Sequence, residues 1–155
     1  MTPEMVETAR ENAAESDADN LEFRLGEIEH LPVADASVDA ILSNCVVNLS
    51  PEKSQVFAEA FRVLRPRGRL AISDVVKTTR LPAELRTDLE SLTGCIAGAA
   101  RIEELESMLA EAGFESIAVE PDDDSDEFIR EWDPDRDLSD YVVSATIGAR
   151  KPADR

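Results

Sequence analysis

A chain of 155 residues with 43% hydrophobic side chains is long enough to form one domain with a buried core. Its formal net charge of −18 arises from 34 acidic residues against 16 lysines and arginines, and so negative a field repels nucleic acids and anionic membrane surfaces. The sequence contains no apolar run long enough to cross a membrane and no visible secretory signal. We therefore expect a cytoplasmic protein whose partners include neither nucleic acid nor membrane.

The acidic excess also predicts a halophilic protein. Only three of the basic residues are lysines, namely Lys53, Lys77 and Lys151. A surface this acidic repels itself at low ionic strength, whereas 1 M salt screens charges beyond about 3 Å. The composition thus indicates adaptation to a salty cytoplasm and says little about the substrate.

The first part of the chain predicts one helix and two strands. Thr2 caps a helix that begins at Pro3, because the N–H that proline lacks is not needed at the first helical position. Residues 21–25 (LEFRL) alternate apolar and polar side chains, which is typical of a strand. A loop over 26–39 leads to residues 40–44 (AILSN), a short apolar run of the buried, parallel type.

A second helix and a third strand are predicted next. Ser50-Pro51 repeats the capping arrangement of the first helix, and residues 65–68 (RPRG) should end this second helix. Residues 69–76 (RLAISDVV) then read as a strand. The helix carries an apolar stripe at helical spacing, made of Val56, Phe57, Ala60, Phe61 and Leu64.

The last part of the chain continues the alternation. Leucines at helical spacing predict a helix over 81–92, and Gly113 is placed to end another at its C′ position. The other expected elements are a small-residue loop at 94–98, a helix at 102–114, a strand at 115–121, an acidic connection at 122–128 and a long strand at 140–151. Strands that alternate with helices indicate an α/β sheet with helices on its faces.

Asn44 and Cys45 follow directly on a predicted buried strand. In open α/β sheets, ligands bind beyond the carboxyl ends of the strands, so these two residues should face a cleft. The chain has only two cysteines, Cys45 and Cys95, which is too few for a disulfide framework. We interpret them as either buried or reactive thiols.

At this point the sequence resembles a known family. The order of MTPEMVETARENA, FRLGEIEHLPVADASVDAILSNCVVNLSPEK, FRVLRPRGRLAISDVV and TGCIAGA is similar to that in arsenite methyltransferases, which are S-adenosylmethionine-dependent enzymes with the class I methyltransferase fold. FIREWDP and YVVSATIGARKP resemble the C-terminal strand of that family. The resemblance extends from Met1 to about Pro152, and the pair SNCVVNLSP and TGCIAGA is its most specific part.

The resemblance implies a Rossmann-like α/β sheet with flanking helices that lacks the first two strands and the first helix of the family. Residues 1–155 would form a single domain, equivalent to the C-terminal two-thirds of a methyltransferase domain. It also implies that Cys45 and Cys95 are the catalytic thiolates that bind trivalent arsenic, which fits the preference of soft thiolates for soft centres. For the cofactor, it places Asn44 at the methionine end of S-adenosylmethionine, Ile28 and Glu29 at the adenine, and Met1 against the ribose and adenine.

Each of these residues also has a plainer interpretation. Cys45 could be a small buried hydrophobe, Glu29 a solvated carboxylate and Asn44 a capping amide. A zinc site from His30, Cys45 and Cys95 is another reading, although no close ligand pair such as C-x-x-C supports it. Asp74, which ends another strand, is expected to be a polar residue on the rim of the cleft.

The sequence departs from the family in one respect. It contains no GxGxG loop and no acidic residue at the position expected for the ribose, since its six glycines are dispersed. In the family, two further strands separate the strands that 21–25 and 40–44 would form. Without them, 40–44 would have an exposed edge that invites pairing. The strand at 21–25 could move beside 40–44, two copies could pair, or an N-terminal partner chain could complete the sheet.

These observations lead to a functional prediction with alternatives. We expect an arsenite methyltransferase-like protein that is impaired as a lone chain and forms a homo-oligomer or a complex with an N-terminal partner chain. The alternatives are a non-catalytic thiol module that binds arsenicals or another soft metal, and a degenerate fragment that serves as an interaction partner.

Overall fold

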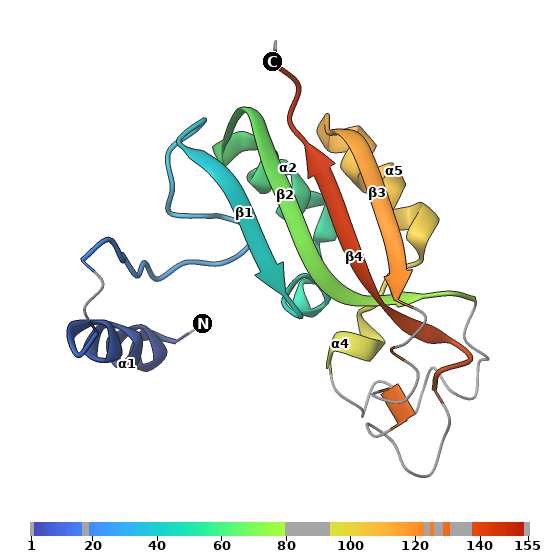
Figure 1. The fold of residues 1–155 in the computed structure, drawn as a ribbon, viewed down its shortest axis with the longest axis horizontal. Helices are drawn as coiled ribbons and strands as arrows, with labels where there is room; N and C mark the ends of the chain where they lie inside the picture. The colour runs from blue at the N-terminus through green and yellow to red at the C-terminus, as the bar shows by residue number, and fades with distance from the viewer. Residues whose placement is uncertain are drawn as a thin grey trace.

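The structure, a computed structural model, describes residues 2–16, 19–79, 94–122, 125, 129–130 and 138–153, with only the backbone of Gly94 and Cys95. A four-stranded sheet forms its centre in the order β1-β2-β4-β3 (Figure 1). β1 runs parallel to β2, whereas β4 runs antiparallel to both of its neighbours. The strands are β1 (Val38–Asn44), β2 (Leu64–Lys77), β3 (Glu115–Asp122) and β4 (Val142–Arg150).

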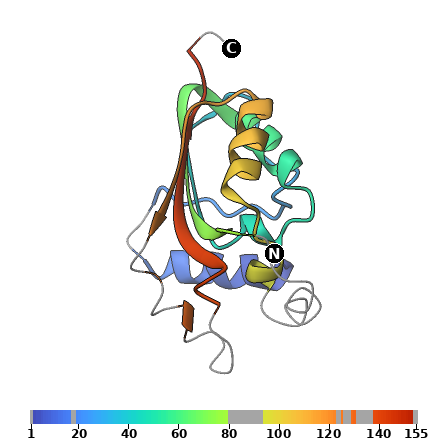
Figure 2. The ribbon, with the colours of Figure 1, turned by 90° about the vertical axis from the view of Figure 1, so that its right-hand side faces the viewer.

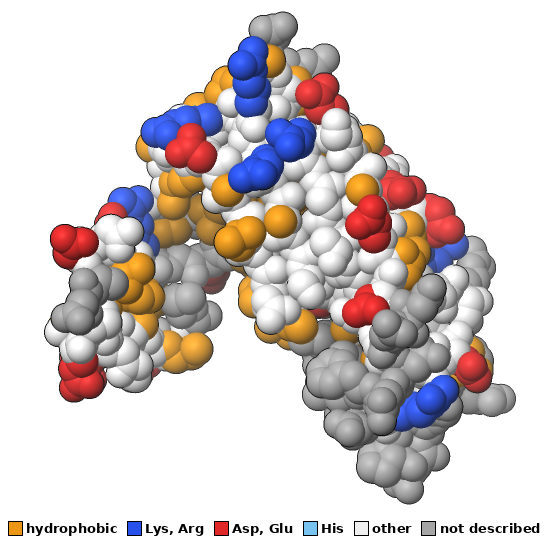
Figure 3. All heavy atoms as spheres, in the orientation of Figure 1, with side chains coloured by type: hydrophobic (Ala, Val, Ile, Leu, Met, Phe, Trp, Pro, Cys, Tyr) orange, Lys and Arg blue, Asp and Glu red, His pale blue; other side chains and the backbone are white. Residues whose placement is uncertain are grey.

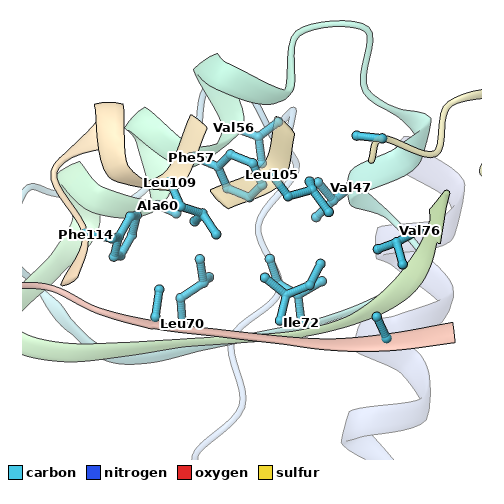
Figure 4. Close-up of a cluster of buried hydrophobic side chains, with 14 of the residues drawn as sticks. Val47, Val56, Phe57, Ala60, Leu70, Ile72, Val76, Leu105, Leu109 and Phe114 are labelled. Carbon is cyan, nitrogen blue, oxygen red and sulfur yellow. The ribbon is translucent and has the colours of Figure 1, made fainter. Parts of the chain in front are cut away.

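Two helices cover one face of this sheet. Figure 2 shows α2 (Lys53–Val63) and α5 (Ile102–Ala112) side by side on the same face. Their apolar stripes meet the inward side chains of β2 and β4 in one core, which includes Phe57, Leu70, Ile72, Leu105 and Leu109 (Figure 4). The remaining helical segments in the described part are α1 (Pro3–Ala14), the 3-10 turn η1 (Val47–Leu49) and α4 (Gly94–Ala97).

Local sequence signals explain where these helices begin and end. The Thr2 hydroxyl accepts a hydrogen bond from Met5 N at 3.3 Å, so the predicted cap of α1 is confirmed. Gly113 ends α5 with φ 103°, a left-handed conformation that glycine adopts without steric cost. Leu64 already has extended backbone, so α2 ends at Val63, and Pro66 soon afterwards could not continue a helix.

The predicted fold class is confirmed, and so are four of the predicted strands. Those at 40–44, 69–76, 115–121 and 140–151 correspond to β1, β2, β3 and β4. As expected, β1 lies at the edge of the sheet: among the described residues it pairs only with β2, and its Leu42 side chain is 83% exposed.

Other expectations were wrong. Residues 21–25 form no strand, because an alternating pattern needs a neighbouring strand to give it a hydrogen-bond ladder. Residues 65–68 do follow the end of α2, as predicted, but they also belong to β2, where they bulge between two register positions: Leu64 pairs with Val38 and Arg69 with Ala40. Residues 94–97 of the predicted loop form the short helix α4.

The start of α2 also differs from the prediction. Its N-cap is Glu52 rather than Ser50, and the Ser50 hydroxyl accepts a hydrogen bond from Glu52 N at 3.1 Å just ahead of the helix. The predicted helix at 81–92 lies outside the described residues, as does most of the acidic connection at 122–128.

The second face of the sheet is open in the described structure. Figure 3 shows this face, on which backbone and uncharged polar side chains predominate and basic side chains gather toward one end. Leu42, Asn44, Ser73 and Thr146 are exposed there. α1 stands apart from the sheet, beyond the β1 edge (Figure 1). No helix within the described ranges is long and apolar enough to cross a membrane.

Candidate functional site

Cys45 occupies a tight turn immediately after β1. Its φ of 52° lies in the left-handed region, which a cysteine adopts only where its surroundings impose it. Its backbone N–H donates to the carbonyl of Ser73 on β2 at 2.9 Å, and its Sγ donates to Asn44 Oδ1 at 3.4 Å. The side chain is exposed. The predicted position of Cys45 at a carboxyl strand end is thus confirmed, and the interpretation as a buried hydrophobe is wrong.

A buried polar pair fixes the segment that follows Cys45. Asn48, in the middle of η1, donates from Nδ2 to Asp74 Oδ1 at 2.8 Å and to the carbonyl of Val75 at 2.7 Å. The backbone N–H of Asn48 also donates to Asp74 Oδ2, at 3.2 Å. Asn48 and Asp74 are only 4% and 2% exposed. Asp74 is therefore an interior residue, and the prediction that it lies on a cleft rim was wrong.

Cys95 lies in α4, which packs against both η1 and β2. Lys77, at the end of β2, holds this segment at two points: its Nζ donates to the carbonyl of Ala97 at 3.3 Å, and its backbone N–H donates to the carbonyl of Ala100 at 2.9 Å. The fold therefore places both cysteine-bearing segments against η1 and the carboxyl end of β2. The Cys95 side chain itself is outside the described part of the structure.

Partial burial and the charge of Asp74 oppose thiolate formation at Cys45. Partial desolvation and the negative charge of Asp74 raise the pKa of the Cys45 thiol. Burial likewise raises the pKa of Asp74, although the amide donors of Val75 and Asn48 act in the opposite direction. Desolvation and repulsion from Lys77 lower the pKa of Lys53, whose Nζ donates to the Ser50 carbonyl at 3.0 Å. Lys53 thus interacts electrostatically with both Lys77 and Asp74.

Ile28 and Glu29, the expected adenine residues, both line a cavity of about 600 Å³ between the 24–32 segment, β1, the turn after it and α2. Glu29 accepts a hydrogen bond from the Ser50 hydroxyl, and this contact lowers the pKa of its carboxyl group. The Glu29 carbonyl accepts a further bond from Gln55 Nε2 at 3.2 Å. Glu29 is therefore tied to the start of α2 and is half-buried rather than fully exposed.

Asn44, expected at the methionine end of the cofactor, does not line this cavity. Asn44 lines a second cavity of about 370 Å³ on the sheet, together with Ser73 and Thr146. Ser43 borders both cavities. Met1 lies outside the described residues. Asn44 is bonded to Cys45 rather than to a helix end, so its capping interpretation is wrong.

Among the described side chains, no group of three His, Cys, Asp or Glu residues could hold a metal ion. His30 is exposed and contacts the carbonyl of Glu29. The zinc site from His30, Cys45 and Cys95 remains untested, because the Cys95 side chain is not described.

Sequence reasoning missed Asn48 and misplaced Asp74, the two buried polar residues that bond to each other next to the Cys45 turn. Asn48 lies between apolar residues in VVNL, and a lone amide in an apolar run is a signal for a buried hydrogen-bonding role. Asp74 lies within a buried strand, in AISDVV, where the same argument applies. Neither residue revealed its partner, because 26 positions separate them along the chain.

Comparison with known proteins gives consistent matches. The sequence is 62% identical over 153 residues to an arsenite methyltransferase of Halobacterium salinarum, covering 99% of this chain and 39% of that protein. It is 45% identical over 98 residues to an arsenite methyltransferase of Aquipseudomonas alcaligenes, covering 61% of this chain and 28% of that protein. The chain thus spans well under half the length of these relatives.

A solved structure agrees. The crystal structure of CrArsM, an arsenic(III) S-adenosylmethionine methyltransferase from Chlamydomonas reinhardtii, superimposes with a TM-score of 0.71 at 31% identity, covering 98% of this chain and 53% of that chain. The resemblance to arsenite methyltransferases is therefore confirmed. Residues 1–113 match the sequence model of the methyltransferase domain family. The chain belongs to the methyltransferase domain family.

Proposed function

We propose that this chain is the arsenic-binding part of an arsenite methyltransferase, in which Cys45 and Cys95 bind one trivalent arsenic. The observation that carries the proposal is the shared support of the two cysteine segments: η1 follows the Cys45 turn, and α4, which contains Cys95, packs against η1. The sequence identity of 62% to an arsenite methyltransferase over 153 residues supports the same role.

The thiols supply the binding chemistry. Each cysteine that replaces a hydroxyl group of As(OH)₃ forms one As–S bond, breaks one As–O bond and releases one water molecule. Thiolate sulfur is a soft ligand and favours soft centres such as trivalent arsenic. Because two sulfurs from one chain hold the same atom, the arsenic is fixed in position, and positioning provides much of the catalysis in group transfer.

The cofactor of this function would be S-adenosylmethionine, which supplies an electrophilic methyl group on a sulfonium. The adenine end fits the residues present. Ile28 offers an apolar contact in the larger cavity, and the Glu29 carboxylate retains acceptor capacity beyond its bond from Ser50. Asn44 would contact the methionine end from the neighbouring strand end. Met1 would lie against the ribose and adenine.

The partners follow from the open surfaces. We propose that the β1 edge pairs with another copy of the chain or with a chain that carries the upstream half of the fold, because an uncovered edge strand is a template for pairing. A cytoplasmic location would keep both thiols reduced.

Titration with phenylarsine oxide tests the proposal. The reagent has two replaceable positions on arsenic, so one molecule should bind per reduced chain. Cys45→Ser and Cys95→Ser should each weaken binding at least about tenfold, since chelation makes the second As–S bond intramolecular. A phosphine reductant is used so that no small thiol competes. Equal affinity of the wild type and either variant would mean that the cysteines do not act as a pair.

A further inference from the structure

We propose that Asn48 and Asp74 are positioning residues that hold the Cys45 thiol at the separation from Cys95 that a shared arsenic requires. This inference rests on the proposed function. In that function, Asn48 and Asp74 contact neither the arsenic nor the cofactor. Its basis is the way in which the Cys45 turn is anchored to β2.

Two consecutive residues of β2 anchor the chain on either side of the thiol. The carbonyl of Ser73 accepts from Cys45 N at 2.9 Å, and the carboxylate of Asp74 accepts from both the backbone and the side chain of Asn48. Only Val46 and Val47 lie between Cys45 and Asn48. The turn that carries Cys45 is therefore clamped at both ends, which is how a residue can be kept at φ 52°.

The clamp is buried, so it has few alternative arrangements. Both Oδ atoms of Asp74 accept hydrogen bonds, with a further bond to Oδ1 from Val75 N at 2.8 Å. Asn48 Nδ2 uses both of its hydrogens, one to Asp74 and one to the Val75 carbonyl. A fully satisfied buried network has a single favourable geometry, and removal of one member leaves the others unpaired.

The same clamp supports the second thiol segment. α4 packs against η1, whose central residue is Asn48, and Lys77 joins α4 to the strand that contains Asp74. A shift of η1 would therefore change the distance between the two cysteine-bearing segments. The distance sets the effective concentration of the second thiol, so the affinity for an arsenical that binds both thiols depends on it. The affinity for an arsenical that binds a single thiol does not depend on this distance.

The test compares two arsenicals. Phenylarsine oxide forms two As–S bonds, whereas dimethylarsinous acid has one replaceable hydroxyl and forms a single As–S bond with release of one water. For Asn48→Ala, the dissociation constant of phenylarsine oxide should rise at least about tenfold, and that of dimethylarsinous acid should change less than about twofold. Asp74→Asn keeps the side-chain volume but turns an amide toward the amide of Asn48. It should change the two dissociation constants in the same way as Asn48→Ala.

Lys151→Met provides the matched control. Lys151 is also buried, at 6% exposure, and its Nζ donates to the carbonyls of Phe61 and Leu64 at 2.6 and 2.8 Å, at the opposite end of β2. Its substitution should lower the melting temperature and leave the affinities for both arsenicals unchanged. A merely structural role of Asn48 and Asp74 predicts that their variants resemble this control.

The outcomes separate the two levels of the argument. A wild type that binds phenylarsine oxide no more tightly than Cys45→Ser overturns the proposed function and this inference with it. A wild type that chelates arsenic, beside Asn48 and Asp74 variants that chelate it equally well, overturns the inference alone. Loss of the folded circular dichroism spectrum in both variants also counts against it, because a positioning role requires a chain that folds without the pair.

Discussion

Arg62 donates to the carboxylate of Glu59 one turn earlier on α2, at 2.7 and 2.8 Å, and both residues bind the backbone of the segment after Glu29. The Glu59 carboxylate accepts from Leu31 N at 2.8 Å, and Arg62 donates to the carbonyls of Leu31 and Val33 and to Asp35. This pair therefore fastens the segment behind the proposed adenine residues to a core helix.

The Glu59 contact predicts a pH-dependent stability. The hydrogen bonds from Arg62 lower the pKa of Glu59 despite its burial, so the ionised carboxylate stabilises the folded state above the unfolded pKa of about 4.3. That contribution is lost as the pH falls through the lower folded pKa. Glu59→Gln should lower the free energy of unfolding by about 1 kcal/mol at pH 7. In strong acid, the variant and the wild type should have the same free energy of unfolding.

Thermal melts of both proteins between pH 7 and pH 2 measure this effect. Glu106→Gln, an exposed position on α5, serves as the control and should melt like wild type throughout. A constant difference between Glu59→Gln and wild type across the whole range would show that the ionised carboxylate is not the source of the stability.

The acidic surface predicts a strong dependence on salt. With a net charge of −18, the folded state should gain stability as ions screen its self-repulsion. The melting temperature should rise steeply between low salt and molar KCl, and equally in NaCl, because screening does not distinguish the two cations. Scanning calorimetry that shows a flat melting temperature in both salts would refute the halophilic prediction.

The exposed edge of the sheet predicts self-association. Leu42 is 83% exposed on β1, which pairs on one side only in the described sheet. Sedimentation should show a dimer or larger species for wild type, and Leu42→Lys should shift it toward monomer by placing a charge in the contact. Leu21→Lys, an exposed leucine away from the sheet, should leave association unchanged. A monomeric wild type at high micromolar concentration would contradict this prediction.

The cofactor is predicted to bind weakly to this chain alone. The sequence has no GxGxG loop to approach S-adenosylmethionine, and the candidate residues Glu29 and Asn44 line separate cavities. We expect a dissociation constant no tighter than about 1 mM, or about −4 kcal/mol. Isothermal calorimetry on the purified chain measures it directly, and a micromolar value would show that the remaining residues form a complete cofactor site.

The sequence correctly predicted those helices and strands whose caps, stops and apolar patterns are formed by adjacent residues. The Thr2 cap, the Gly113 stop and the apolar strands at 40–44 and 69–76 all depend on neighbouring residues, and the structure contains each of them. Residues 21–25 have an equally good alternating pattern. They form no strand because a strand depends on partners elsewhere in the fold.

The candidate site divides in the same way. Cys45 could be placed at a strand end from the sequence, because the carboxyl end of a buried strand is a local feature. The burial of Asp74 could not, since it depends on Asn48 reaching across from another segment. Similarly, the RPRG bulge in β2 follows from its register against β1, which no pattern within 65–68 indicates.

Arsenic X-ray absorption spectroscopy tests the central claim most directly. One equivalent of arsenite is added to the reduced chain in a phosphine buffer, so that every sulfur neighbour of arsenic must come from the protein. We expect two sulfur neighbours per arsenic in wild type and one or none in Cys45→Ser. An arsenic surrounded by oxygen alone in wild type, or the same sulfur coordination in both proteins, would contradict the assignment of Cys45 and Cys95 as a shared arsenic site.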